Sequence, residues 1–354
     1  MKLIVISTAR IIGLLLLGML IAASGIWGVL AISYSGPASD ILRTALAFIF
    51  AIASLGTLIA LASHIWRWRA LAGYLIVFTF LVSGWRSIKP SNERDWQTDV
   101  AVLPYATMEG DIVAVHNIRN FAYRSETDYS VAYYDKRFDI KRLEGVDLIA
   151  SYWMGPDIAH VFVSFAFAGG DHLAISIETR KEKHEDYSTL KGFFRQYELY
   201  YVVADERDVI RLRSNYRRSP PEDVYVYRMR APIENSRRLF LEYLVQMNAL
   251  KAKPEFYNTM TTNCTTNIWM NSRVNPEHLP FNWTVLASGH VAEYLYAHGR
   301  LESGGLSFAE LQRHAHINAR AQATNGAADF SQRIRDWSAT PALRVTNQAP
   351  TSGN

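Results

Sequence analysis

The chain has 354 residues, a single cysteine and a formal net charge of +4. Five of its 37 basic residues and one of its 33 acidic residues fall within the first 85 positions, so the rest of the chain is electrically neutral. Nucleic-acid binding requires a local excess of Lys and Arg, and we therefore do not expect it. One cysteine also excludes an intramolecular disulfide framework and a cysteine-rich metal site.

The first 85 residues contain three apolar stretches that predict transmembrane helices. Ile11–Ser33 and Ile41–Ser63 are long enough, because about 20 apolar residues cross the hydrocarbon core of a bilayer. Ala70–Trp85 is shorter, and flanking arginines extend it by reaching toward the headgroups. A cleaved signal peptide is the alternative for the first stretch, which is longer than the usual apolar region of about 7–15 residues. We expect a membrane anchor over residues 1–85 and a linker over residues 86–100.

Charges in the short loops predict the orientation of this anchor. Lys2 and Arg10 precede the first span, and Arg67 and Arg69 lie between the second and third spans. Because Lys and Arg concentrate on the cytoplasmic side, the N-terminus is expected in the cytoplasm. Three spans then deliver the remaining chain to the extracytoplasmic face, which is the periplasm in a Gram-negative cell.

Strand patterns dominate the next part of the chain, and helix patterns follow. The clearest hairpin joins His160–Ala168 to His172–Glu178 through Gly169-Gly170-Asp171. Amphipathic periodicity predicts helices over Asn235–Ala252, from Cys264 onward and over about Ser307–Ala323. Other expected strands are Asp111–Val115, Tyr123–Tyr134, Val146–Trp153, Tyr197–Val203, Val209–Arg213 and Val224–Met229. These elements predict an α+β domain over residues 101–337, followed by a disordered tail over residues 338–354.

The lone cysteine stands in a sequence that is typical of a helix start. Thr262 and Asn263 precede Cys264, and both residue types cap helices. A cysteine in the first turn lies beside unsatisfied N–H groups and the positive end of the helix dipole, which favour the reactive thiolate. The alternative is a small buried apolar side chain. Outside the cytoplasm an unpaired thiol is exposed to oxidation, and its polar neighbours favour a nucleophile.

A nucleophilic thiol needs a neighbouring imidazole, and His160 is the candidate because it opens the predicted hairpin. The odd-numbered apolar residues of both strands must be buried together, so odd positions pair with odd ones. His160 then shares the other face with Ser176, Glu178 and Arg180. Glu178 is expected directly opposite or diagonal to His160, within about 5–8 Å at Cβ. We expect Glu178 to orient His160; a surface cross-strand pair is the alternative.

Several of these segments, in this order, resemble the bacterial lipoprotein N-acyltransferase family Lnb, specifically its N-terminal periplasmic domain. The resemblance covers about Asp99 to Gly299. It rests on the hairpin from His160 to Arg180, on Tyr197–Tyr201 with Asp205–Asp208, on Thr262–Asn267 and on Ser288-Gly289-His290. The family is similar to permuted papain-like thiol enzymes of the NlpC/P60 type, in which the histidine precedes the cysteine in the chain.

The resemblance implies a thiol acyltransferase of the bacterial inner membrane. Cys264 would be the acyl-accepting nucleophile and His160 its base, with Asn263 and Thr265 supporting the oxyanion. Arg180 and His290 are expected to line the site. The implied substrates are bacterial lipoproteins, N-acylated at their lipid-modified N-terminal cysteine, and a membrane lipid that donates the acyl chain. No metal or cofactor is expected.

Two other functions remain open from the sequence. A cysteine peptidase or amidase acting on cell-wall peptides would use the same Cys–His pair with water in place of the amine. A membrane-tethered scaffold with a buried thiol would use neither residue for catalysis. The sequence does not distinguish a phospholipid donor from the lipoprotein's own glyceryl ester.

Overall fold

The computed structural model describes residues 2–37 and 39–337, which form two compact units. Unit 1 holds the N-terminal helices up to Glu93 together with Asp186–Glu198 and Glu255–Thr259, and unit 2 holds the rest of the described chain. The units are therefore not continuous in sequence. The boundaries expected near residues 85, 100 and 337 stay a prediction, and the tail expected over residues 338–354 lies outside the described residues.

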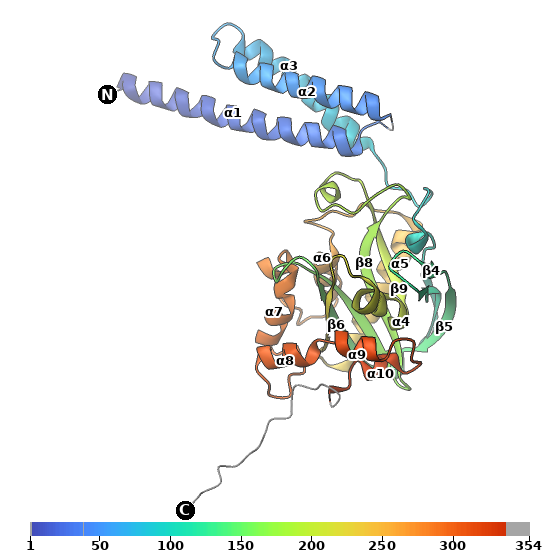
Figure 1. Ribbon diagram of the computed structural model, residues 1–354. Helices are drawn as coiled ribbons and strands as arrows, with labels where there is room; N and C mark the ends of the chain where they lie inside the picture. The colour runs from blue at the N-terminus through green and yellow to red at the C-terminus, as the bar shows by residue number, and fades with distance from the viewer. Residues whose placement is uncertain (1, 38, 338–354) are drawn as a thin grey trace, which may run out of the picture. The chain divides into compact units, whose positions relative to one another are not determined.

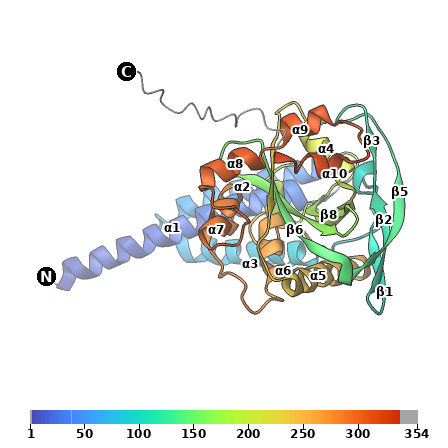
Figure 2. The same ribbon diagram turned by 90° about the horizontal axis from the view of Figure 1, so that it is seen from below.

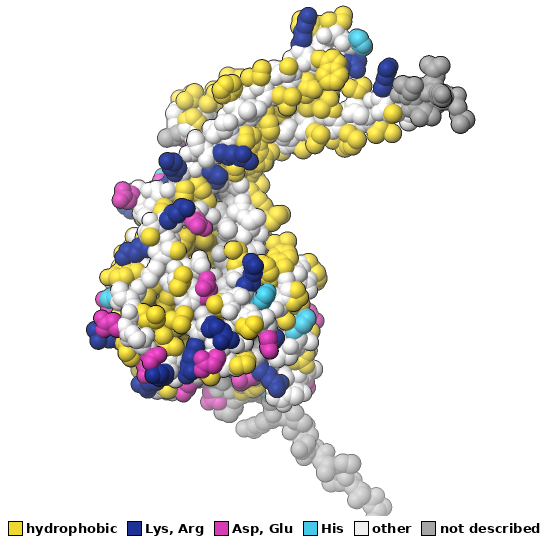
Figure 3. Space-filling model, turned by 180° about the vertical axis from the view of Figure 1, so that it is seen from behind, with side chains coloured by type: hydrophobic (Ala, Val, Ile, Leu, Met, Phe, Trp, Pro, Cys, Tyr) yellow, Lys and Arg dark blue, Asp and Glu magenta, His cyan; other side chains and the backbone are white. Residues whose placement is uncertain are grey.

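Three apolar helices form most of unit 1, as the sequence predicts. They are α1 (Lys2–Ser35), α2 (Asp40–Ala60) and α3 (Arg67–Ser87), and each contains a window long and apolar enough to cross a membrane. Figure 3 shows hydrophobic side chains over these helices and a mixture of basic and acidic side chains over unit 2. A Cβ on Gly28 would lie 2.3 Å from the ring of Phe50, so glycine permits the close packing of α1 on α2.

Within unit 1, Asp186–Glu198 packs on these helices, and Glu255–Thr259 packs on that segment. The ring of Phe194 lies 5.6 Å from that of Tyr34, and Arg195 donates hydrogen bonds of 2.9 Å to the carbonyls of Arg86 and Ile88. A cation at these carbonyls is favourable, because the last carbonyls of a helix lack partners within the helix. Asp186–Glu198 thus belongs to unit 1, which we call the membrane-helix unit.

An eight-stranded sheet forms the centre of unit 2, in the order β1-β2-β9-β8-β7-β6-β10, with β5 also paired to β2. Its neighbours are antiparallel at β1–β2, β2–β5, β6–β7, β7–β8 and β6–β10, and β2 pairs with β9 in parallel. The strands are β1 (Tyr105–Glu109), β2 (Ile112–Arg119), β5 (Tyr133–Asp139), β6 (Leu143–Tyr152), β7 (Ala159–Phe167), β8 (Asp171–Arg180), β9 (Glu198–Ala204) and β10 (Asp223–Arg228). A separate hairpin pairs β3 (Ala122–Tyr123) with β4 (Tyr129–Ser130).

Helices cover both faces of this sheet (Figures 1 and 2). Phe162 on one face packs in a cluster with residues of α4, α9 and α10, whereas Phe165 on the other contacts Phe240 of α5 at 5.0 Å between ring centroids. The α-helices are α4 (Glu206–Arg211), α5 (Ile233–Ala252), α6 (Cys264–Ser272), α7 (Val291–Ala297), α8 (Phe308–Ala315), α9 (Asn318–Ala323) and α10 (Phe330–Arg333). Shorter helical turns are Thr98–Val100, Ile140–Arg142, Lys191–Phe193, Leu212–Tyr216, Trp283–Val285 and Ser288–His290.

The α+β architecture is confirmed, and three local predictions are wrong. The expected strand Val209–Arg213 belongs to α4 and the following turn, because Asp205 accepts the N–H of Arg207 at 2.9 Å and caps a helix there. The expected strand Tyr123–Tyr134 is broken by a turn in which Arg124 N–H donates to the Asp128 carbonyl. The helix expected over Ser307–Ala323 is interrupted where the N–H of Ile317 donates to the Val224 carbonyl of β10.

Candidate thiol active site

The lone cysteine opens α6, and the helix start is built by its neighbours. Asn263 is extended, and its side-chain oxygen accepts the N–H of Thr266 at 2.8 Å, which satisfies one of the orphan donors of the first turn. Cys264 is buried, with 9% of its surface exposed. The thiol therefore lies at the positive end of a capped helix, as the sequence predicts.

The surroundings of Cys264 favour its ionised form. Burial by itself raises the pKa of the thiol, but a hydrogen bond with His160 and the charge of that imidazole lower it. The backbone N–H groups of Val161 and Thr265 also point at the sulfur, and the net effect holds the pKa of Cys264 below its usual value. A thiolate paired with an imidazolium is the arrangement that attacks carbonyl carbons.

The hairpin places His160 beside two oxygen acceptors. The β7–β8 ladder pairs Val163 with Ile175 at its end, and beyond it the side chains of His160 and Glu178 lie close together, as the sequence predicts. The Nε2 atom of His160 lies 2.7 Å from Ser176 Oγ and 3.4 Å from Glu178 Oε1, and the Ser176 hydroxyl donates to Glu178 at 2.8 Å. Because Nε2 faces this pair, Nδ1 is the ring nitrogen left for the thiol.

The charges around His160 stabilise its protonated form. Burial and the nearby Arg213 lower the pKa of the imidazole, but hydrogen bonds with Cys264 and Glu178 outweigh them and raise it. Burial would raise the pKa of Glu178, whereas Arg213 and His160 hold it well below its usual range. Glu178 is therefore a carboxylate whose charge favours the protonated form of His160.

Arg213 is the member of this site that sequence reasoning missed. Its guanidinium donates to Glu178 Oε1 at 3.0 Å and to Glu222 Oε2 at 3.1 Å, and 5% of its side chain is exposed. Burial raises the pKa of Glu222, but Arg213 and Arg217 lower it to about 2. In the sequence, Arg213 ends a segment whose pattern predicts a strand. The segment is helical instead, and its last turn directs the Arg213 side chain toward Glu178 of β8. We call Cys264, His160, Ser176, Glu178 and Arg213 the thiol cluster.

A later segment fixes the residue before His160. The Ser288 hydroxyl donates to the Ala159 carbonyl at 2.6 Å and accepts the Ala159 N–H at 3.0 Å. A Cβ on Gly289 would lie 2.0 Å from the Pro156 carbonyl oxygen, so glycine is required where the segment meets the turn before β7. The Ser288-Gly289 pair thus holds the start of the strand that carries the imidazole.

The other predicted site residues have different surroundings. Asn263 uses its side-chain oxygen as the helix cap, and the Thr265 hydroxyl donates to the Val285 carbonyl at 2.5 Å. Arg180 is buried and donates to the Val100 and Ala101 carbonyls, with its guanidinium 4.2 Å from the ring of Trp96. His290 lies 2.9 Å from Asp157, in a different cavity from the one that Thr265 lines. Oxyanion support and site lining by these four residues stay predictions.

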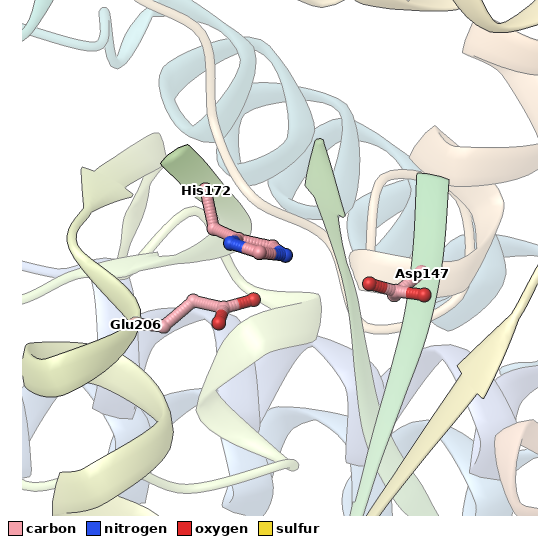
Figure 4. Close-up of side chains that lie close together, drawn as sticks. All are labelled: Asp147, His172 and Glu206. Carbon is pink, nitrogen blue, oxygen red and sulfur yellow. The ribbon is translucent and has the colours of Figure 1, made fainter. Parts of the chain in front are cut away.

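A second group of acidic and histidine side chains lies on the same sheet. Asp147, His172 and Glu206 converge, each with one ligand atom within 4.8 Å of the others (Figure 4). Arg335 donates to Asp147 at 2.7 Å and to Glu206 at 2.8 Å, and burial, which raises the pKa of Glu206, is outweighed by Arg335, which lowers it to about 2. We call these four residues the arginine cluster. A guanidinium between the carboxylates fits a structural ion-pair group better than a metal site.

Comparison with known proteins adds one finding. Residues 129–289 match the family model of the Lnb N-terminal periplasmic domain, and neither the curated proteins nor the solved structures give a match. The matched segment contains the whole thiol cluster, and it confirms the family resemblance drawn from the sequence. With three apolar helices before it, the chain is a membrane protein with a domain of this periplasmic family.

Proposed function

We propose, because residues 129–289 belong to the Lnb N-terminal periplasmic domain family, that this protein is an acyltransferase that uses Cys264 as its nucleophile. The family implies a role related to lipoprotein N-acylation. The proposed reaction N-acylates the lipid-modified N-terminal cysteine of bacterial lipoproteins, with a membrane lipid as acyl donor. The observations that carry the proposal are that Cys264 begins the capped helix α6 and that His160, which Ser176 and Glu178 support, holds the pKa of the Cys264 thiol below the usual value.

The first half of the reaction forms a thioester. His160 takes the proton of the Cys264 thiol, and the sulfur attacks the carbonyl carbon of the donor ester. The S–C bond forms and the C–O bond breaks, and the proton on His160 moves to the departing alcohol oxygen. Glu178 stabilises the imidazolium between these two proton transfers.

The second half forms the amide. The α-amine of the lipoprotein's N-terminal cysteine attacks the thioester carbon, the N–C bond forms and the S–C bond breaks. His160 takes a proton from the amine nitrogen, and the thiolate of Cys264 leaves in the form that its surroundings stabilise. A thiolate with a lowered pKa is a good leaving group, which suits a thioester intermediate.

Membrane anchoring suits both proposed substrates, because each carries acyl chains in the bilayer. The chain returns to the membrane-helix unit at Glu255–Thr259, five residues before Cys264. We propose the inner membrane, with the N-terminus in the cytoplasm and the thiol domain in the periplasm. Alkaline phosphatase fused after Asn354 should then be active, and an inactive fusion with normal expression would overturn this topology.

Mass spectrometry of one lipoprotein N-terminus tests the proposed function. Cells that depend on this protein should lose the N-acyl group with Cys264→Ala or Cys264→Ser, while the variants remain folded in the membrane. Met270→Ala, an exposed position on the same helix, is the matched control and should behave like wild type. Persistent N-acylation with Cys264→Ala would exclude the proposal. Unchanged lipoproteins with lost cell-wall peptide cleavage would identify a peptidase or amidase instead.

A further inference from the structure

An apolar cavity of about 170 Å³ lies beside the helix that carries the thiol. Its walls come from β6, β7, α5, α6, α7 and the segment around Thr284 and Val285, all within unit 2. The apolar side chains that line it include Val146, Leu148, Val163, Leu239, Ile268 and Leu295. The proposed two-step reaction assigns no role to this cavity.

The cavity begins one helical turn from the nucleophile. Its α6 wall consists of Thr265, Ile268, Trp269 and Ser272, which form one stripe of the helix. Ile268 lies four residues after Cys264, and residues at this spacing have Cβ atoms about 5–6 Å apart on a helix surface. From Cys264 to Ser272 the helix rises about 12 Å at 1.5 Å per residue. A chain attached to the sulfur can therefore follow the stripe over Ile268.

Several polar groups in the cavity walls are bonded within the protein, whereas the buried Thr284 hydroxyl has no hydrogen-bond partner among the described residues. The Thr265 hydroxyl donates to the Val285 carbonyl, and Trp269 Nε1 donates to the Leu279 carbonyl at 3.0 Å. Arg300, which also lines the cavity, donates to the Glu277 carbonyl at 3.0 Å. A peptide would need donors and acceptors for its backbone, whereas a hydrocarbon chain needs only apolar contact.

We propose that this cavity, which we call the α6 cavity, holds the acyl chain of the thioester on Cys264. The proposal rests on the proposed acyl transfer and adds a binding site for a straight hydrocarbon chain. Each methylene group that enters apolar surroundings favours the bound chain by about fourfold. The cavity thus makes long-chain donors better substrates than short-chain esters of the same chemistry.

N-alkyl iodoacetamides test the cavity without requiring acyl transfer. The Cys264 sulfur displaces iodide, so an S–C bond forms as the C–I bond breaks, and the chain has one cysteine to label. In full-length protein in detergent, the rate for a dodecyl reagent relative to iodoacetamide should fall at least tenfold in Ile268→Trp. Met270→Trp, exposed on the opposite side of α6, is the matched control and experiences the same micelles. Its rate ratio should equal that of wild type.

Leu239→Trp provides a second obstruction from α5, on another wall of the cavity. In this variant, short alkyl reagents should react with Cys264 at the wild-type rate and longer reagents more slowly. Leu239→Trp replaces Ile268→Trp as the test if Ile268→Trp lowers the melting temperature. The proposal is overturned if both variants keep the wild-type rate ratio. It is also overturned if, in folded variants, the alkylation rates with short and long reagents fall by the same factor. Since alkylation needs only a reactive thiol, these outcomes are separate from loss or persistence of lipoprotein N-acylation.

Discussion

Two clusters of charged side chains lie on one face of the same sheet, and they differ in the groups that contact their histidines. Strand β7 contributes His160 to the thiol cluster. Further along β7, the Ser164 hydroxyl donates a hydrogen bond to Glu206 of the arginine cluster. These positions are four residues apart on the strand, a distance of about 13 Å. Between them, Phe162 is fully buried and packs with the core.

Both clusters contain a histidine, at least one carboxylate and an arginine, so residue types alone do not distinguish them. In the arginine cluster the guanidinium of Arg335 binds both carboxylates, and His172 Nδ1 contacts the Gly170 carbonyl. In the thiol cluster one carboxylate supports an imidazole whose other side meets a thiol. Under the proposed function, the neighbour on the other side of the histidine distinguishes a cluster that stabilises the fold from one that activates a nucleophile.

Replacing the histidine of each cluster should give the largest difference between the two clusters in the rate of Cys264 acylation. His160→Ala should slow acylation of Cys264 by about 10²–10⁴-fold, the usual contribution of a general acid–base group. His172→Ala should leave the rate within about twofold, because its cluster has no thiol to activate. Quenched-flow mass spectrometry of Cys264 with an ester donor measures both. Equal losses in the two variants would refute the division of roles.

Removing the arginine that joins two carboxylates should chiefly affect stability. Arg335→Met leaves Asp147 and Glu206 buried with less compensation, which typically costs about 3–5 kcal/mol. The matched control Arg333→Met breaks an exposed pair with Asp329 and should cost less than about 1 kcal/mol. Denaturant unfolding in detergent, with Cys264 reactivity measured on the folded fraction, separates these effects. Similar unfolding of both variants would show that Arg335 does not stabilise the cluster.

The smallest expected effect is a shift of the pH profile in Glu178→Gln. Because Glu178 raises the pKa of His160, its removal lets the imidazolium lose its proton at lower pH. The alkaline limb of the acylation rate should move down by roughly one pH unit, the lower end of shifts caused by one nearby opposite charge. Glu144→Gln changes an exposed carboxylate of β6 and should leave the limb in place. A profile unchanged in Glu178→Gln would make Glu178 structural.

Much of the thiol cluster was predictable because local rules determine it. Hairpin register fixes Glu178 opposite His160, and capping residues fix Cys264 at a helix start. The β7–β8 hairpin and the three apolar helices follow from alternation and from length for the same reason.

Arg213 and Arg335 were not predictable, because long-range packing brings them to the sheet. Val209 and Ile210 favour a strand by composition, yet the Asp205 cap and burial between sheet and α9 make this segment helical. Arg335 meets Asp147 across 188 residues of sequence. Residues so far apart in the sequence leave no local pattern, so the arginine of each cluster can be identified only from the folded structure.

The central claim is that Cys264 carries the acyl group, and intact-protein mass spectrometry tests it most directly. Full-length protein incubated with lipid donor vesicles should gain the mass of one acyl chain, on Cys264, and release it to neutral hydroxylamine. The adduct should be absent in Cys264→Ala. Lipoprotein N-acylation by wild-type protein without this adduct, or an adduct that persists in Cys264→Ala, would contradict the account.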